Sequence, residues 1–173
     1  ALDEFETLDL APHPARVVCR ADHPLTRLAA PTVQEVLQYP IAGPSMAHED
    51  IEAVLRLFPA AERRRLRQKG VLTIVCDSAP VLATVVQQSD CLALLYLFLV
   101  EDDLRAGRIR VLPNIEIKPG PSLGMARLRN RTLSRPAAAF LDALLEYDRE
   151  LVERDALLLS ELSAGTINPR VRR

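Results

Sequence analysis

The sequence contains very little lysine, since only Lys69 and Lys118 among its 22 basic residues are lysines. The remainder are arginines, a bias typical of a GC-rich bacterial genome. Excess charge is also missing, because the net charge is −1 over 173 residues. This excludes broad electrostatic attraction to nucleic acid or to an anionic membrane, so either partner would require a local basic patch.

Common motifs for metal and phosphate binding are absent. There is no CxxC pair, the three histidines lack i,i+3 or i,i+4 spacing, and there is no Gly-rich phosphate loop. We therefore expect no metal and no cofactor. Cys19, Cys76 and Cys91 lie far apart in apolar surroundings, which indicates small buried thiols in a reducing compartment.

Long hydrophobic runs are missing as well. The longest, CLALLYLFLV at 91–100, is too short to span a bilayer, and no signal peptide opens the chain. The sequence thus predicts a cytoplasmic protein. Because it begins at Ala1 rather than at Met, we expect it to be part of a longer chain.

What is present is a sequence of 49% hydrophobic residues, enough for one sizeable core or two small lobes around a shared cleft. Segments typical of strands and helices alternate, which predicts an α/β fold with a largely parallel sheet. The expected strands are 16–20, 41–42, 71–76, 92–96, 108–112 and 123–129. The expected helices are 32–38, 48–58, one after Ser78, one at 99–104 and a long one from near Ser134.

Local signals refine these expectations. Thr32 and Glu35 form a capping-box pattern, so a short helix is expected to begin there. The continuous β-rich run at 71–76 predicts a strand buried on both faces. Residues 1–15 contain two prolines and predict an extended leading segment rather than a packed element.

Four segments stand out by their order and spacing. These are VVCRADHPLTR (17–27), TVQEVLQYPIAGP (32–44), LVEDDLRAGRIRVL (99–112) and RTLSRPAAAFLDALLE (131–146). Together they resemble the effector-binding domain of LysR-type transcriptional regulators, which has the type 2 periplasmic-binding-protein fold. The chain departs from that family at Ser89-Asp90-Cys91, where a Gly-x-Gly usually leads into the buried strand.

The resemblance implies a specific division of the chain. Residues 1–15 form the leading segment and 16–130 form one complete α/β lobe, the second lobe of the domain. Residues 131–160 form a helix that returns to a second, incomplete lobe, and 161–173 form a disordered tail. A first half-lobe and a winged helix-turn-helix DNA-binding domain are missing, so the apolar side of the last helix is expected to lack a cover.

The function implied is a ligand-sensing, non-enzymatic module. A small metabolite would bind between the lobes and change how the subunits of a homo-oligomeric regulator associate on DNA. This segment is expected to make no direct contact with nucleic acid or membrane, because the missing domain would bind the DNA.

The expected effector-binding residues follow two strand ends, where open α/β sheets place their ligands. They are Gly43, Pro44, Ser45, Met46, Asp77 and Ser78. The start of the helix after Ser78 can hold a carboxylate or a hydroxyl, and the neighbouring Asp77 favours a hydroxyl-rich or neutral ligand. The alternative is that Ser78 only caps a helix and Ser45 only turns a loop.

Other functions stay open at this point. An enzyme would use Cys19, Cys76 or Ser78 as nucleophile with His23 or His48 as base. The sequence favours a turn at His23-Pro24 over a reactive cluster of Cys19, Asp22 and His23. A transport-type solute-binding protein shares the expected fold but needs export.

Two charged features have structural interpretations. The basic run at 63–69 lacks interleaved aromatics and has acidic neighbours, so a solvated helix face is favoured over nucleic-acid binding. Asp90 lies between apolar segments and is expected either to pair with an arginine or to end a turn.

Overall fold

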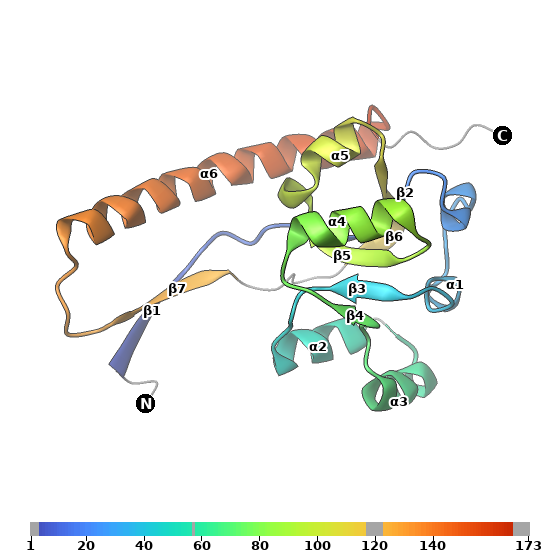
Figure 1. Cartoon of the computed structure of the whole chain (residues 1–173), viewed down its shortest axis with the longest axis horizontal. Coiled ribbons are helices and arrows are strands. Elements are labelled where there is room, and N and C mark those ends of the chain that lie inside the picture. Colours follow the sequence, from blue (N-terminus) through green and yellow to red (C-terminus); the bar gives the residue numbers. More distant parts are fainter. Residues whose placement is uncertain (1–3, 57, 117–122, 168–173) are drawn as a thin grey trace.

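Strands and helices alternate through the computed structural model, which describes residues 4–56, 58–116 and 123–167 (Figure 1). The strands are β1 (Phe5–Asp9), β2 (Ala15–Arg20), β3 (Ile41–Gly43), β4 (Ile74–Val75), β5 (Leu92–Tyr96), β6 (Ile109–Glu116) and β7 (Gly124–Leu128). The α-helices are α1 (Val33–Val36), α2 (His48–Leu55), α3 (Ala60–Lys69), α4 (Ala79–Gln88), α5 (Glu101–Arg105) and α6 (Arg135–Ala164). Two 3₁₀ helices, η2 (Pro24–Arg27) and η3 (Leu97–Leu99), complete the described elements.

Side-chain caps fix the starts of two helices. Before α1, the Thr32 hydroxyl accepts from the Glu35 N–H at 3.3 Å, and the Glu35 carboxylate accepts from the Thr32 N–H at 2.7 Å. This confirms the predicted capping box. Ser134 caps α6 by accepting from the Ala137 N–H at 3.3 Å. Both helices therefore begin where the sequence predicts.

The main sheet has five strands in the order β4-β3-β5-β2-β6. β3 is parallel to β4 and to β5, whereas β2 is antiparallel to both β5 and β6. The α/β class is confirmed. Because β6 is antiparallel to β2, it runs in the same direction as β5, so β4, β3, β5 and β6 share one direction and β2 alone opposes them. The expectation of a largely parallel sheet therefore holds for strand direction, with β2 as the exception.

The expectation of a buried strand at 71–76 is wrong. Only Ile74 and Val75 pair as a strand, which is an outermost strand of the sheet. Val75 is 60% exposed. A continuous apolar run predicts a strand but does not show whether a neighbour covers it. Whether this strand is buried depends on its place in the strand order of the sheet. An apolar run in the sequence does not determine that place.

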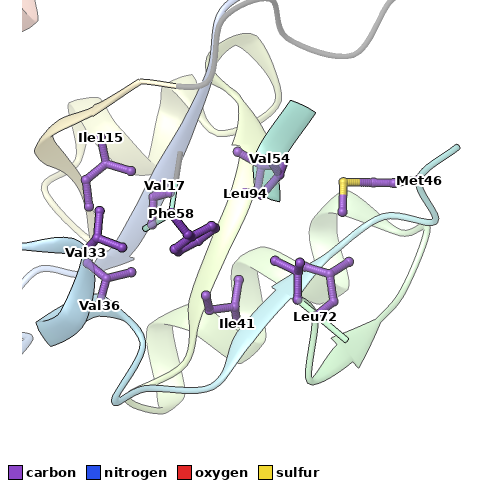
Figure 2. Close-up of a pocket in the computed structure, with 11 residues that line it drawn as sticks. Val17, Val33, Val36, Ile41, Met46, Val54, Phe58, Leu72, Leu94 and Ile115 are labelled. Carbon is purple, nitrogen blue, oxygen red and sulfur yellow. The ribbon is translucent and has the colours of Figure 1, made fainter. Parts of the chain in front are cut away.

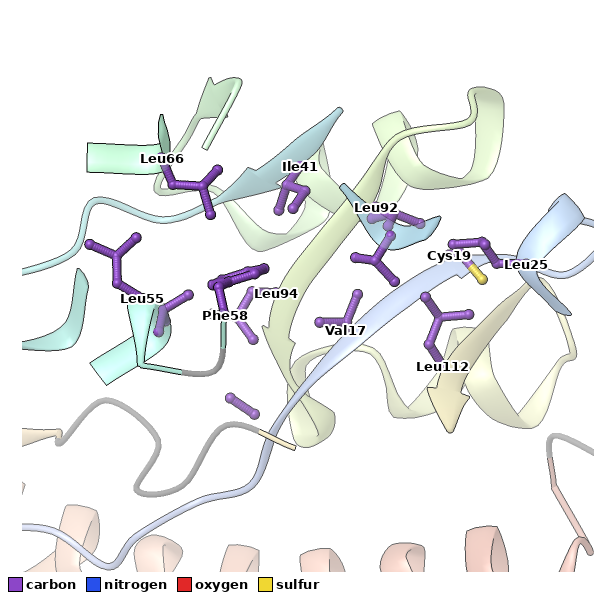
Figure 3. Close-up of a cluster of buried hydrophobic side chains, with 13 residues drawn as sticks. Val17, Cys19, Leu25, Ile41, Leu55, Phe58, Leu66, Leu92, Leu94 and Leu112 are labelled. Atoms are coloured by element: carbon purple, nitrogen blue, oxygen red, sulfur yellow. The ribbon is translucent and has the colours of Figure 1, made fainter. Parts of the chain in front are cut away.

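Alternating side chains of the sheet build two separate hydrophobic cores. Val17, Leu92 and Leu94 belong to one core with α1, α2 and α3, whereas Val18, Ala93 and Leu95 belong to the other with α4, α5 and the end of α6. Figure 3 shows the first core. Helices thus cover both faces of the sheet, which explains why β5 is apolar throughout.

A second, two-stranded sheet forms where the sequence predicted only a leading segment. β1 pairs antiparallel with β7, with Phe5 opposite Leu128 and Asp9 opposite Gly124. Figure 1 shows this ribbon projecting away from the five-stranded sheet. The expectation of an unpacked segment at 1–15 is therefore wrong, because its partner strand lies more than a hundred residues away in sequence.

Helix α6 runs from the ribbon back across the lobe (Figure 1). Its buried residues begin near its midpoint and are Asp148, Leu151, Asp155 and Leu158. Phe140, in the first half, is 66% exposed, whereas Leu141, Leu144 and Leu145 of the same apolar stripe are half-buried.

The tail begins later than expected. Helix α6 continues to Ala164 and ends at Gly165, which has a φ of 70°, so the predicted boundary at residue 160 is wrong. Residues 168–173 of the predicted tail lie outside the described residues. Within the described residues, no helix combines the length and apolarity required to cross a membrane.

Candidate functional site

The two predicted ligand loops lie side by side at one edge of the main sheet. Since β3, β4 and β5 are mutually parallel in direction, their carboxyl ends share that edge. The Cys76 N–H donates to the Gly43 carbonyl at 3.0 Å, which joins the loop after β3 to the loop after β4. The structure therefore brings the predicted residues together.

A side-chain clamp holds these loops. The Ser45 N–H donates to one Asp77 carboxylate oxygen at 2.7 Å, and the Ser45 hydroxyl donates to the other at 3.1 Å. Both residues are exposed. The arrangement presents a negatively charged, hydroxyl-bearing surface, which is suited to a ligand that donates hydrogen bonds.

Gly43 and Met46 have packing roles at the base of this site. Gly43 is buried, and a Cβ there would lie 3.2 Å from the Leu72 side chain, so the close contact suits glycine. Met46 packs against the first core and lines an apolar cavity beneath the loop, as Figure 2 shows. Pro44, between Gly43 and Ser45, is half-buried.

Ser78 lies at the start of α4 and is exposed. Its carbonyl accepts from the Leu82 N–H at 3.0 Å, but its hydroxyl makes no capping hydrogen bond to the helix. Pro80 in the first turn removes one further N–H. The interpretation of Ser78 as a side-chain cap is therefore wrong.

The chain crosses between the two sheets at this same edge. Ala15, the first residue of β2, pairs with Tyr96, the last residue of β5. Just after β1, the Leu10 N–H donates to the Leu123 carbonyl at 3.0 Å, which continues the β1–β7 pairing by one residue toward the lobe. The candidate loops therefore lie at the end of the main sheet where the chain enters from the ribbon.

A buried cluster that the sequence did not predict lies in the segment that crosses from β1 to β2. The His13 Nδ1 lies 2.6 Å from a carboxylate oxygen of Asp155, and the His13 Nε2 lies 3.0 Å from one of Asp148. The Ala11 N–H donates to the second Asp148 oxygen at 3.0 Å. We call His13, Asp148 and Asp155 the His13 tether, because it joins the crossing segment to α6.

The geometry of the tether favours a protonated histidine. Each ring nitrogen faces a carboxylate oxygen, and a neutral imidazole carries only one N–H. Burial lowers the pKa of His13, but hydrogen bonds to Asp148 and Asp155 outweigh it, so the pKa lies above its ordinary value of 6.5. Burial dominates at Asp155, whose carboxyl pKa is raised.

Part of the tether had a signal in the sequence. Asp148 and Asp155 are seven residues apart, so they share a face of α6 with Leu151 and Leu158. Two acids on the buried stripe of a helix need partners. Nothing in the sequence identified His13, which lies 135 residues before Asp148.

The histidine in the opening motif has a structural role. The His23 Nδ1 accepts from the Leu25 N–H at 3.1 Å, and its Nε2 lies 3.3 Å from the Asp90 carbonyl. Burial raises the pKa of the Cys19 thiol to about 12, while Asp22 is exposed and pairs with Arg20. The predicted turn is confirmed, and Cys19, Asp22 and His23 do not form a nucleophile with its base.

The Ser89-Asp90-Cys91 segment also has a structural explanation. The Ser89 hydroxyl donates to the Val85 carbonyl at 2.6 Å and accepts from the Cys91 N–H at 3.1 Å, which ends α4. The Asp90 carboxylate accepts from Arg20 at 2.7 Å. The expected pairing of Asp90 with an arginine is confirmed.

The basic run forms the exposed side of α3. The Arg67 guanidinium pairs with Glu52 at 2.6 Å, and the Arg65 guanidinium lies 3.6 Å from Glu62. The predicted solvated helix face is confirmed. In the part of the chain that the structure describes, no group of His, Cys, Asp or Glu side chains could hold a metal ion.

Comparison with known protein families matches most of the chain. The family model described as LysR substrate binding domain matches residues 1–149. The SDS degradation transcriptional activation protein of Pseudomonas sp. (strain ATCC 19151) is 29% identical over 152 residues, covering 84% of this chain and 46% of that protein. The chain thus spans less than half the length of this curated relative.

Solved structures share the fold. The effector domain of the transcriptional regulator AmpR of Pseudomonas aeruginosa matches with a TM-score of 0.62 and 23% identity, covering 91% of this chain and 71% of that chain. The Synechocystis PCC6803 CcmR regulatory domain in complex with 2-PG matches with a TM-score of 0.54 and 16% identity, covering 84% of this chain and 67% of that chain.

Proposed function

The chain belongs to the LysR substrate binding domain family, and on that premise we propose that it senses a small metabolite for a transcriptional regulator and catalyses no reaction. The observation that carries this proposal is the joined pair of loops at the sheet edge, held by the Ser45–Asp77 clamp. These loops lie at the end of the main sheet where β2 enters from the ribbon. A ligand seated there would therefore contact the hinge between two lobes.

The division of the chain follows from the same arrangement. We assign the five-stranded sheet with α1 to α5 to one lobe, within the proposed 16–130 segment. We assign the β1–β7 ribbon and the first half of α6 to the other lobe. The separation of the ribbon from the main sheet and the exposed Phe140 support this assignment. Further strands of the second unit would cover the exposed side of α6.

The surface chemistry favours a ligand with several hydroxyl groups. Ser45 and Asp77 offer acceptor oxygens, while the Ser78 hydroxyl makes no bond to its own helix. The carboxylate disfavours an anionic group beside Asp77, whereas the start of α4 can hold one at its N–H groups. Gly43, Pro44 and Met46 would shape the floor beneath the ligand.

Sensing would work through the connection between lobes. A ligand that binds one arrangement of the lobes more tightly shifts the population toward it. The His13 tether couples the crossing segment to α6, so a change at the hinge would move this helix. In a homo-oligomeric regulator this would alter subunit association on DNA, with the DNA held by another domain and the protein in the cytoplasm, away from membranes.

A thermal-shift screen tests this function. We would measure the melting temperature of the 173-residue chain with polyhydroxylated metabolites, and with 2-PG because the CcmR regulatory domain binds it. We expect at least one to raise the melting temperature. Ser78→Ala and Asp77→Asn should reduce that rise, whereas Ser160→Ala on the exposed side of α6 should not. A rise that both site variants leave intact would contradict the proposal.

A further inference from the structure

A small apolar cavity lies between the sheet, the helices α1 and α2, and Phe58 in the segment after α2. It has a volume of about 40 Å³, and all of its lining residues are apolar (Figure 2). Val17 and Leu94 line it from the sheet, while Val36 and Phe58 line it from the helical side. A cavity of this volume has room for roughly three water-sized groups, which suits a short alkyl segment.

A larger hollow with cationic residues adjoins this cavity. It has a volume of about 390 Å³ and shares Ile41, Val71 and Leu72 with the apolar cavity. Arg65 and Lys69 of α3 line its outer part. None of the described residues that line it is acidic. The hollow therefore offers cations, and the cavity with which it shares these three apolar residues offers an apolar space.

The cations of the hollow are available to a ligand. Lys69 is exposed, and the Arg65 guanidinium lies 3.6 Å from Glu62, too far for a good hydrogen bond. By contrast, Arg67, which does not line the hollow, has its guanidinium bonded to Glu52 at 2.6 Å and 3.0 Å. Arg65 can therefore bond an anion without losing a strong partner.

We propose that the cavity and the hollow form one binding site for an amphiphilic anion. The carboxylate, sulfate or phosphate head bonds Arg65 and Lys69, and the alkyl chain passes Ile41 and Leu72 into the apolar cavity. This site is distinct from the loops at Ser45 and Asp77. It nevertheless touches them, since Met46 lines the cavity and Leu72 packs on Gly43, so an occupied cavity would affect the candidate effector site.

The proposal predicts two independent dependences of affinity. Each methylene buried in the apolar part should raise the affinity about fourfold until the cavity is full. Loss of both cations should lower the affinity for an anion about fivefold. An uncharged alcohol of the same length should bind more weakly and should not respond to loss of the cations.

The experiment uses titration calorimetry on the 173-residue chain with butanoate, hexanoate and octanoate as monomeric probes, and with octanol and acetate as probes lacking head charge or tail. We expect affinity to rise along the acid series and to fall for octanoate in the Arg65→Ala/Lys69→Ala variant. Arg64→Ala is the matched control, because Arg64 is exposed on the same helix and does not line the hollow. Circular dichroism would verify that the variants are folded.

Several results would overturn the proposal. These are an affinity independent of chain length, or octanoate binding that the double variant leaves unchanged. Amide NMR shifts on octanoate addition should map to residues 36–41 and 65–73, and shifts confined to 43–46 and 77–78 would contradict the site. Such a failure would leave the proposed function standing, because the two sites use different polar residues.

A lipid headgroup offers the same chemistry as a free acid. Sedimentation with anionic phosphatidylglycerol vesicles distinguishes the two sources. Capture by these vesicles that depends on Arg65 and Lys69 would assign the site to a lipid, whereas octanoate binding without vesicle capture would assign it to a free amphiphile. Absence of both would overturn the proposal.

Discussion

A single buried histidine joins the two ends of the chain. His13 lies between Asp148 and Asp155, and removing it would leave two carboxylates close together without their cation. We expect His13→Ala to lower the free energy of unfolding by roughly 3 kcal/mol, measured by urea denaturation. His48→Ala, at an exposed position, is the matched control and should change it by less than about 0.5 kcal/mol. Equal effects of the two variants would contradict the tether.

The tether also predicts a pH dependence. Because the folded-state pKa of His13 is raised, its contribution to stability is complete below about pH 6.5 and is lost as the pH rises through the folded-state pKa. The raised pKa of Asp155 acts in the same direction. The pKa of Asp148 is lowered: burial opposes this shift, but hydrogen bonds from His13 and Ala11 outweigh it, so its contribution is lost below about pH 3.8. Burial lowers the pKa of His23, which acts in the opposite direction in both chains. The difference in stability between the native chain and His13→Ala, measured from pH 5 to 9, should therefore shrink as the pH rises.

The reactivity of the three cysteine thiols distinguishes a regulator from an enzyme with a cysteine nucleophile. Burial raises the pKa of Cys19 to about 12 and also raises the pKa of Cys91, so neither forms a thiolate near neutral pH. Cys76 is only half-buried. Iodoacetamide labelling followed by peptide mass spectrometry should modify Cys76 first in the folded chain. Rapid labelling of Cys19 would contradict this and support a nucleophile.

Sequence patterns that span a few residues predicted the local roles of side chains. Contacts between residues far apart in the sequence could not be predicted. The Thr32–Glu35 capping box and the turn at His23 depend on neighbours within three residues. The partner of His13 depends on how α6 returns across the lobe, which no local pattern encodes. For the same reason the sequence placed Ser45 and Asp77 at strand ends but did not predict their hydrogen bond.

At the scale of elements, an ion-pair network fastens α6 to α5. Glu101 accepts from Arg105 at 2.8 Å and from Arg154 at 2.6 Å, and Arg105 also bonds Glu161 at 2.7 Å. We expect Glu101→Gln to cost about 1 to 2 kcal/mol and to speed hydrogen exchange in the second half of α6. Asp102→Asn, at an exposed site in the same turn, should lower the free energy of unfolding by only a small fraction of that amount. Unchanged exchange in Glu101→Gln would contradict the network.

Sequence patterns predicted where several helices and strands begin, but not how the strands pair. Capping residues and β-branched runs predicted α1, β2 and α6 near their observed starts. They did not predict that β4 is an outermost strand of its sheet, that β2 is antiparallel to its neighbours, or that β1 pairs with β7. Each of these depends on which strands become neighbours, and local propensity carries no information about that.

At the scale of the whole molecule, the first half of α6 presents apolar side chains to solvent. Phe140 in this half is 66% exposed, and Leu157, further along the same helix, is 55% exposed. We expect the isolated chain to associate with rising concentration, as measured by sedimentation velocity. Phe140→Asp should weaken this association, while Val75→Asp on the outermost strand β4 serves as the control for an exposed apolar residue elsewhere. Association abolished only by Val75→Asp would contradict the role of α6.

The central claim is that the loops after β3 and β4 form the sensing site. The most direct measurement is an amide NMR titration of the chain with the metabolite that gives the largest thermal shift. We predict that the largest shifts fall at residues 43–46 and 77–82, with smaller shifts at 10–15 in the crossing segment. Shifts confined to other surfaces, with these residues unperturbed at saturation, would contradict the claim.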